Sequence, residues 1–250
     1  MESGIYAACS AMMARSQELD ILANNLANVS TTGYKGETQF YQALTAASGG
    51  QPLGALNTDV NRFGVLGGQS LNLEAGPIKP TNNPLDVALQ GPGFLEVQTK
   101  AGILYTRAGN LQEGAKGELQ TALGDPVLGV DAKGKTGPIY MPSGPVAIAA
   151  DGTISVGGAL VSTLKLVNFA PNTPLRPVGD AYFAAPAGSA KPAAGASVLQ
   201  GSLESSNVNP VAAETDLIAL QRNFDLVEHA LKIFNTDFDQ PAATQLPQVS

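Results

Sequence analysis

The clearest pattern of apolar and polar positions lies at the two ends of the chain, where apolar residues recur with a period of seven. Near the start, Ile5, Met12, Leu19 and Leu26 fall seven apart, and Leu22 follows Leu19 by three. In the last fifty residues the spacing alternates between three and four, at Leu217, Leu220, Phe224, Val227, Leu231, Phe234 and Phe238. Such a row lets a helix pack along partner helices. We therefore predict that both ends are helical and pair as a coiled-coil-like bundle.

Start and stop signals place the two helices. The first spans residues 4–29, and the polar stretch Ser30-Thr31-Thr32-Gly33 is expected to end it. The second begins at Asn209-Pro210, because proline suits the first helical turn, and is expected to stop at Pro241. An apolar flank outside its main row consists of Ile218, Leu226 and Ile233. A helix with two apolar stripes needs more than one neighbour to cover it.

The middle of the chain has short apolar runs separated by turn residues such as Gly91-Pro92-Gly93 and Asp151-Gly152. A turn roughly every ten residues predicts an antiparallel β domain of sandwich or barrel type. Residues 184–197 are rich in Ala, Pro and Gly and are interpreted as a flexible surface loop. The runs that we expect to be strands are 85–89, 94–97, 103–105, 126–130, 146–149, 153–156 and 160–169.

The sequence therefore predicts an α+β fold in three parts. Residues 1–33 and 205–250 form a discontinuous helical domain. Residues 34–83 are an extended or irregular connector, and residues 84–204 are a mainly antiparallel β domain. At 250 residues, of which 44% are hydrophobic, the chain can bury one sizeable core or two modest ones.

The charge and the cysteine content argue against several classes of protein. A net charge of −7 argues against a nucleic-acid binder and against a polybasic membrane-surface protein. The single cysteine, Cys9, has no internal partner for a disulfide, and we interpret it as a small residue on a packed helix face. The eight residues before it contain no Lys or Arg and leave no room for a signal peptide. No apolar stretch approaches the roughly 20 residues that span a bilayer.

Candidate chemistry is sparse. The only histidine, His229, has no second histidine and no nearby cysteine with which to bind a metal, and it falls on the outer face of the second helix. Gly129-Val130-Asp131-Ala132-Lys133-Gly134-Lys135-Thr136 matches the phosphate-loop pattern, but Gly137-Pro138 follows where a helix would have to begin. We interpret that stretch as a polar hairpin. The sequence predicts no catalytic residue, no cofactor and no metal site.

Several stretches resemble the bacterial flagellar rod and hook proteins. Residues 22–35, Leu-Ala-Asn-Asn-Leu-Ala-Asn-Val-Ser-Thr-Thr-Gly-Tyr-Lys, are similar to the family's N-terminal motif. Residues 83–94 resemble its central motif, which residues 105–110, Tyr-Thr-Arg-Ala-Gly-Asn, continue. Residues 201–208 and 217–224 resemble its C-terminal motif. The motifs stand in the family's order and cover most of the chain.

The resemblance implies a structural, non-enzymatic subunit of the flagellar basal-body rod. Such a subunit is exported by the flagellar type III apparatus without a cleaved signal and polymerises helically in the periplasm, where it transmits torque from motor to hook. Its partners would be other rod and hook subunits and copies of itself, with no nucleic acid or small-molecule substrate. The terminal helices would form the inner layer of the tube. The length and the single middle domain resemble the rod proteins rather than the longer hook protein, and Gly4-Ile5-Tyr6 and the compact body favour the proximal rod type. The alternatives are the distal rod type or a secreted cell-wall-binding or hydrolytic module.

The helices gain too little from burying one apolar row to offset the entropy of ordering them alone. We therefore expect the ends to be weakly ordered in the monomer and to become ordered between subunits. For Asn24, Asn25 and Asn28 two interpretations stay open, namely caps at the helix end or hydrogen bonds between subunits. The predicted assembly interface comprises Ile5, Met12, Leu19, Leu22, Asn24, Asn25, Leu26, Asn28, Leu217, Leu220, Phe224, Val227, Leu231, Phe234 and Phe238.

Overall fold

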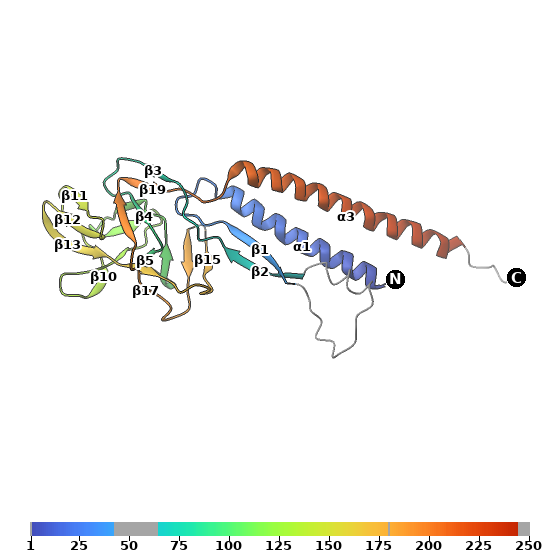
Figure 1. Cartoon of the computed structure of the whole chain (residues 1–250), viewed down its shortest axis with the longest axis horizontal. Coiled ribbons are helices and arrows are strands. Elements are labelled where there is room, and N and C mark those ends of the chain that lie inside the picture. The colour runs from blue at the N-terminus through green and yellow to red at the C-terminus, as the bar shows by residue number, and fades with distance from the viewer. Residues whose placement is uncertain (1, 43–64, 180, 245–250) are drawn as a thin grey trace. The chain divides into compact units, whose positions relative to one another are not determined.

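The computed structural model describes residues 2–42, 65–179 and 181–244, which fall into two compact units (Figure 1). Unit 1 comprises residues 1–26, 37–70 and 209–250, and unit 2 comprises residues 27–36 and 71–208. Of the predicted connector, residues 34–83, the described residues 37–42 and 65–70 belong to unit 1, and residues 34–36 and 71–83 belong to unit 2. The chain passes between the units four times.

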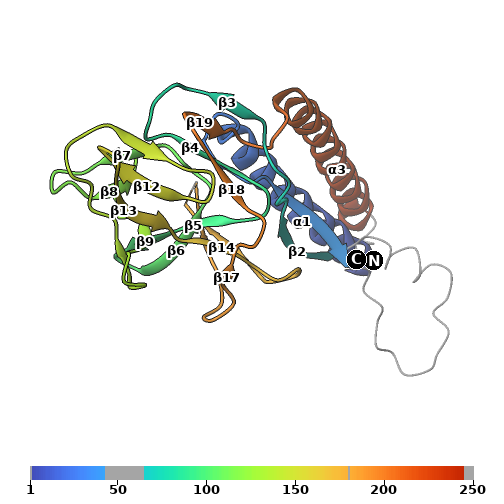
Figure 2. The same cartoon turned by 60° about the vertical axis from the view of Figure 1, so that its left-hand side comes forward.

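Unit 1 contains the two helices that the heptad rows predict, and the α+β fold class is confirmed. Helix α1 spans Glu2–Ala27 and α3 spans Pro210–Thr244, and they run side by side in opposite directions in both views (Figures 1 and 2). Strands β1 (Glu37–Gln42) and β2 (Val65–Leu71) pair as a two-stranded sheet. Neither described helix carries an apolar stretch that could cross a bilayer.

The predicted start of α3 is confirmed, whereas its predicted end is wrong. The side-chain carbonyl of Asn209 accepts hydrogen bonds from the backbone N–H groups of Val211 and Ala212, at 3.1 and 3.3 Å, and thus caps the helix. At the other end the helix continues through Pro241 to Thr244. Proline removes a single backbone donor there, and the alanines that follow, Ala242 and Ala243, favour the helical conformation.

Unit 2 contains the remaining described strands, and the strands paired within it run antiparallel, as predicted. A six-stranded sheet has the order β15-β16-β6-β5-β14-β17, and a five-stranded sheet has the order β10-β9-β13-β12-β11. Three further pairs are β18-β4, β19-β3 and β7-β8. The strands are β3 (Ile78–Pro80), β4 (Val87–Gln90), β5 (Phe94–Thr99), β6 (Gly102–Thr106), β7 (Leu111–Glu113), β8 (Leu119–Thr121), β9 (Leu128–Val130), β10 (Thr136–Pro138), β11 (Val146–Ile148), β12 (Thr153–Val156), β13 (Ala159–Leu164), β14 (Leu166–Asn168), β15 (Arg176–Val178), β16 (Tyr182–Ala184), β17 (Lys191–Pro192), β18 (Ser197–Gln200) and β19 (Ser202–Glu204).

Each predicted apolar run contains a strand, but the longest run, 160–169, divides into two. Strands β13 and β14 belong to different sheets, and Lys165 lies between them. The Lys165 backbone N–H donates to the Leu128 carbonyl at 3.1 Å, while its ammonium pairs with Glu96. The polar residue therefore marks the point at which the chain changes sheets.

The core of unit 2 lies among its sheets. One buried apolar cluster includes Leu89, Leu95, Val97, Leu119, Val127 and Ile154, all almost fully buried. A smaller aromatic cluster joins Phe94, Phe183 and Val167, and the Phe94 ring lies 5.6 Å from that of Phe183. The tract 184–197 lies largely at the surface, but β17 within it pairs with β14 and so extends the six-stranded sheet.

Candidate functional site

Four of the five stretches that resemble rod and hook proteins, residues 22–35, 83–94, 105–110 and 201–208, meet inside unit 2. They meet at the side chains of Glu204 and Arg107. Glu204 is the last residue of β19, which pairs with β3 in the register Glu204↔Ile78. Its carboxylate is completely buried and accepts three hydrogen bonds. The Lys35 ammonium donates to Oε1 at 2.7 Å, the Gly76 backbone N–H to Oε1 at 2.9 Å, and Arg107 Nη1 to Oε2 at 2.8 Å. One carboxylate thus faces two cations, so this ionic cluster has a net positive charge.

Lys35 is as deeply buried as its partner, and its side chain has no exposed surface. Burial lowers the pKa of Lys35 from its usual range, and the nearby Arg107 cation acts in the same direction, although the Glu204 carboxylate opposes both. The ammonium also donates to the main-chain carbonyl of Glu74. Because the Lys35 cation is costly to bury and is held by a single carboxylate, loss of that carboxylate would be especially unfavourable.

Arg107 brings the central motif into the same cluster. Its Nε donates to the Gly93 carbonyl at 2.9 Å, its Nη2 donates to the Gly91 carbonyl, and the guanidinium lies 5.5 Å from the centre of the Phe94 ring. Only a planar group with several donors in a fixed fork can make these contacts together with an ion pair. Arg107 therefore connects the turn between β4 and β5 to the end of β19.

Glycines at two positions allow the backbone of one segment to lie directly against the backbone of another. Gly33 has φ +69°, and a Cβ atom there would lie 2.3 Å from the Ala108 nitrogen. Its own N–H donates to the main-chain carbonyl of Glu204 at 2.8 Å. A Cβ atom on Gly76 would lie 2.0 Å from the Ser205 carbonyl oxygen. No larger residue fits at either position without displacing backbone.

The Asn207 side chain joins three segments near the points where the chain leaves unit 2. Its Oδ1 accepts from the Gly36 N–H at 2.8 Å, and its Nδ2 donates to the carbonyls of Asn72 and Glu74 at 2.8 and 3.1 Å. The Asn72 N–H in turn donates to the Gly36 carbonyl at 2.8 Å. The segments around residues 36, 72 and 207 are thus bound to one another.

The structure gives the asparagines of the first motif different roles. Asn25 is buried, and its amide forms two hydrogen bonds with the backbone of Glu37, donating to the carbonyl at 2.8 Å and accepting from the N–H at 2.9 Å. It therefore fixes the start of β1, a role that neither sequence interpretation included. Asn28 is also buried and accepts from Thr31 just after α1 ends, whereas Asn24 is exposed.

The predicted interface row of α3 faces inward where its side chains are described. Leu220 is buried and Leu217 and Phe224 are half-buried, while the side chains of Val227, Leu231, Phe234 and Phe238 lie outside the described residues. On α1, the predicted row of Met12, Leu19, Leu22 and Leu26 is only half-buried, and the side chain of Ile5 is not described. The most buried described residues of α1 are instead Ala14, Ile21 and Asn25, and Asn28, just after the helix, is also buried.

A second apolar row lies on the outer face of α3. Val211, Ile218 and Leu226 are 70%, 52% and 67% exposed. With 3.6 residues per turn, they fall within about 80° of one another and on the side opposite Ala213, Leu217, Leu220 and Phe224. We call Val211, Ile218 and Leu226 the outer stripe. On α1, Met13 is similarly exposed, at 67%.

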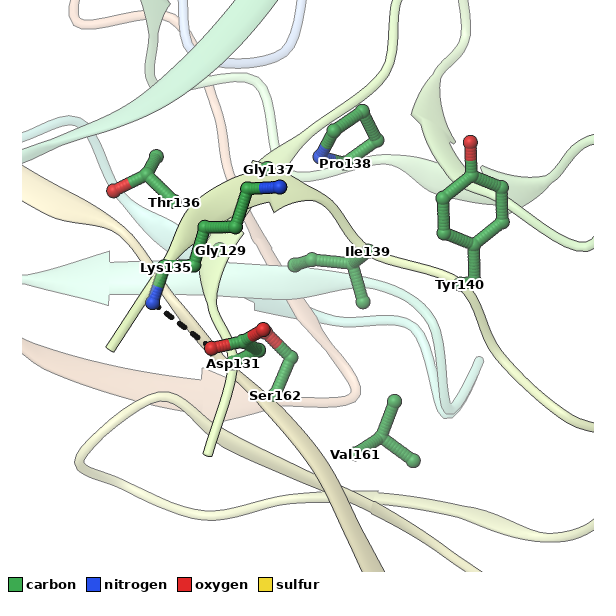
Figure 3. A pocket seen from close by; sticks show the side chains of 10 residues that line it. All are labelled: Gly129, Asp131, Lys135, Thr136, Gly137, Pro138, Ile139, Tyr140, Val161 and Ser162. Atoms are coloured by element: carbon green, nitrogen blue, oxygen red, sulfur yellow. Dashed lines mark hydrogen bonds between the residues drawn. The ribbon is translucent and has the colours of Figure 1, made fainter. Parts of the chain in front are cut away.

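The phosphate-loop-like stretch is a hairpin, as predicted. Strands β9 and β10 pair antiparallel with Thr136 opposite Val130, and the hairpin lines an open cleft of about 360 Å³ (Figure 3). The backbone N–H groups of Lys133 and Lys135 both donate to the Asp131 carboxylate at 2.9 Å. A phosphate cradle needs such donors to point at the ligand, and here a carboxylate of the loop already occupies them.

Comparison with known proteins assigns the family. Residues 5–35 match the model of the flagella basal body rod protein, residues 88–156 match the D1 domain of the flagellar hook protein FlgE/F/G, and residues 199–239 match the C-terminal region of the flagellar basal body rod FlgEFG protein. The flagellar basal-body rod protein FlgF of Caulobacter vibrioides is 34% identical over 91% of both chains, and that of Salmonella typhimurium is 34% identical over the full length of both. The rod protein FlgG of Agrobacterium fabrum is 32% identical over 88% of this chain and 90% of its own.

The chain belongs to the flagellar basal-body rod protein family. It is therefore a structural, non-enzymatic component of the rod, and the alternative of a hydrolytic module is not supported. In the described part of the chain no group of three or more His, Cys, Asp or Glu side chains could hold a metal ion, and His229 is exposed on α3.

Lys35, Arg107 and Glu204 lie within the rod-family motifs, but the sequence did not predict their ionic cluster. A single charged residue in a polar stretch usually indicates a solvated surface. One signal could have separated them from surface charges: each stands beside small residues, in Gly33-Tyr34-Lys35, Arg107-Ala108-Gly109 and Gly201-Ser202-Leu203-Glu204.

Proposed function

We propose that this rod-family chain is a proximal rod subunit of the FlgF type, which polymerises helically in the periplasm and transmits torque from motor to hook. Its partners are copies of itself and other rod and hook subunits, and it reaches them through the flagellar type III export apparatus without a cleaved signal. The FlgF relatives at 34% identity over at least nine-tenths of the chain support the proximal type.

The outer stripe of α3 is the observation that best supports polymerisation. Three large apolar side chains repeat along one face of the helix, on the side opposite the row packed inside the unit. Covering a fully exposed apolar side chain of this size contributes about 1.5–3 kcal/mol. A neighbouring subunit that packs on the stripe would therefore gain several kcal/mol from these residues. The inward row of Leu217, Leu220 and Phe224 stabilises the subunit itself.

A charge placed on the outer stripe tests this division of roles. Leu226→Glu should leave the free energy of unfolding of the monomer within about 0.5 kcal/mol of the original, because the position is exposed. It should prevent assembly, because a carboxylate would be buried at the contact. The matched control is Gln221→Glu, which places the same charge on an exposed position away from both rows. Leu220→Ala, in the inward row, should instead destabilise the monomer by about 2–3 kcal/mol.

The assay is rod completion and swimming in a strain that lacks the gene and carries each variant. Complete rods with Leu226→Glu would contradict the role of the outer stripe. The same deletion strain tests the subtype. A rod that fails to extend beyond the inner membrane ring supports the proximal type, whereas a truncated rod that extends further supports the distal type.

A further inference from the structure

The ionic cluster and the Asn207 contacts belong to unit 2 and involve residues close in sequence to the points where the chain passes from one unit to the other. The chain crosses from one unit to the other after residues 26, 36, 70 and 208. Within unit 2, the Glu204 carboxylate binds Lys35 next to the second crossing and Gly76 near the third, and its own strand leads to the fourth. A single buried side chain thus contacts segments that are 128 and 169 residues away in sequence.

We propose that Glu204 is a latch, whose carboxylate orders the segments 33–36, 72–76 and 204–207 of unit 2 as one set. Without the carboxylate, two buried cations, Lys35 and Arg107, face each other with no anion between them. Like charges without a counterion are unfavourable in a buried site, and the segment that carries Lys35 can relieve this by moving toward water. Gly36 would then leave Asn207 and Asn72, so segments 72–76 and 204–207 lose their contacts with segment 33–36 as well.

The latch differs from an ordinary stabilising ion pair, because its loss should loosen the three segments 33–36, 72–76 and 204–207 together. Glu96 provides the comparison, because it is also buried and pairs with a lysine, Lys165, at 3.1 Å. Its partner lies between β13 and β14 with its side chain 33% exposed, and the ion pair that joins the two residues involves none of the segments 33–36, 72–76 and 204–207. The proposed role of Glu204 would be the same in a proximal and in a distal rod subunit.

Amide hydrogen exchange on full-length Glu204→Gln tests the latch. The probes are the amides of Gly33, Gly36, Asn72 and Ser205, none of which donates to the Glu204 carboxylate. Their acceptors are the Glu204 main-chain carbonyl, Asn207 Oδ1, the Gly36 carbonyl and the Pro77 carbonyl. We expect exchange at all four to rise at least ten-fold, while amides in β12 and β13 change less than two-fold. Glu96→Gln should leave the four probes unchanged.

Three outcomes would overturn the proposal: a change confined to Gly76, an equal rise across all of unit 2, or the same release of the four probes in Glu96→Gln. The double variant Lys35→Met/Glu204→Gln provides a second test. Because it removes one of the two unpaired cations, it should exchange more slowly at the probes than Glu204→Gln alone. If Glu204→Gln does not fold, recovery of a folded double variant supports the latch, and failure of both to fold contradicts it.

Discussion

Unit 2 buries a large apolar core and holds the buried Lys35, Arg107 and Glu204 as one ionic cluster, whereas unit 1 exposes apolar side chains in a row along one helix. Leu95, Val97 and Val127 have no exposed surface, while Leu226 is 67% exposed. Unit 2 also exposes some apolar residues, such as Leu123 in a turn and Leu160 in a hairpin. These stand apart in sequence, however, while the outer stripe recurs along one helix face. The difference is the one expected if, as proposed above, neighbouring subunits cover the outer stripe of unit 1 while unit 2 is packed within the chain.

The largest effect that sharpens this comparison is expected at Gly33 in unit 2. Gly33→Ala must adopt a positive φ and also place a methyl group against the backbone of residues 107 and 108, so we expect a loss of at least about 3 kcal/mol in the free energy of unfolding. Gly134 is the matched control, because it has φ +78° at a hairpin tip but no atom within 4 Å of the added Cβ. Gly134→Ala should cost only about 1 kcal/mol.

Urea unfolding of the two variants measures this difference. Equal losses of stability at Gly33 and Gly134 would show that the contact between Gly33 and the backbone of residues 107 and 108 tolerates an added side chain. Unit 2 would then be less closely packed than this account requires.

A smaller effect is expected from pH at Tyr182, which lies in β16 of unit 2. Burial raises the pKa of Tyr182 to about 12, and the nearby Asp125, which accepts a hydrogen bond from the phenol at 2.8 Å, adds to the shift. In the unfolded chain a tyrosine ionises near pH 10. The unfolded state therefore loses its proton first, and the stability contributed by Tyr182 is present below pH 10 and is lost as the pH rises to 12.

Comparison with Tyr182→Phe isolates this contribution, since both proteins share every other titrating group. The stability difference between them should be constant from pH 8 to 9.5 and should shrink above pH 10. A difference that stays constant to pH 11.5 would show that the Tyr182 phenol is not held in its protonated form by the fold.

The sequence predicted those parts of the fold that depend on repeated apolar positions. The helices follow from their heptad rows, and the longer strands follow from apolar runs. The hairpin at residues 129–136 follows from Gly137-Pro138, which leaves no place for a helix. The sequence did not reveal β3 and β19, because each has three residues with a mixed pattern and its partner lies more than a hundred residues away.

The buried polar and charged residues were harder to predict, because the groups that satisfy them are brought close only by folding. The buried positions of α1 include Ala14, which is small, and Asn25, which is polar, so hydrophobic periodicity favoured the half-buried row of Met12, Leu19 and Leu26. Asn25 is buried because the Glu37 backbone satisfies its amide, and such a partner is visible only in three dimensions. Glu204 and Lys35 lie 169 residues apart in sequence, and only the folded chain brings their side chains together.

Amide hydrogen exchange of the full-length protein, measured in the dilute monomer and again in the assembled rod, tests the central claim most directly. In the monomer we expect strong protection in β5, β12 and β13 of unit 2 and weak protection in α1 and α3, because the outer faces of the helices lack their neighbours. In the rod, protection of both helices should rise to the level of the strands. Helices that are already as protected as the strands in the dilute monomer, and that do not change on assembly, would contradict this account.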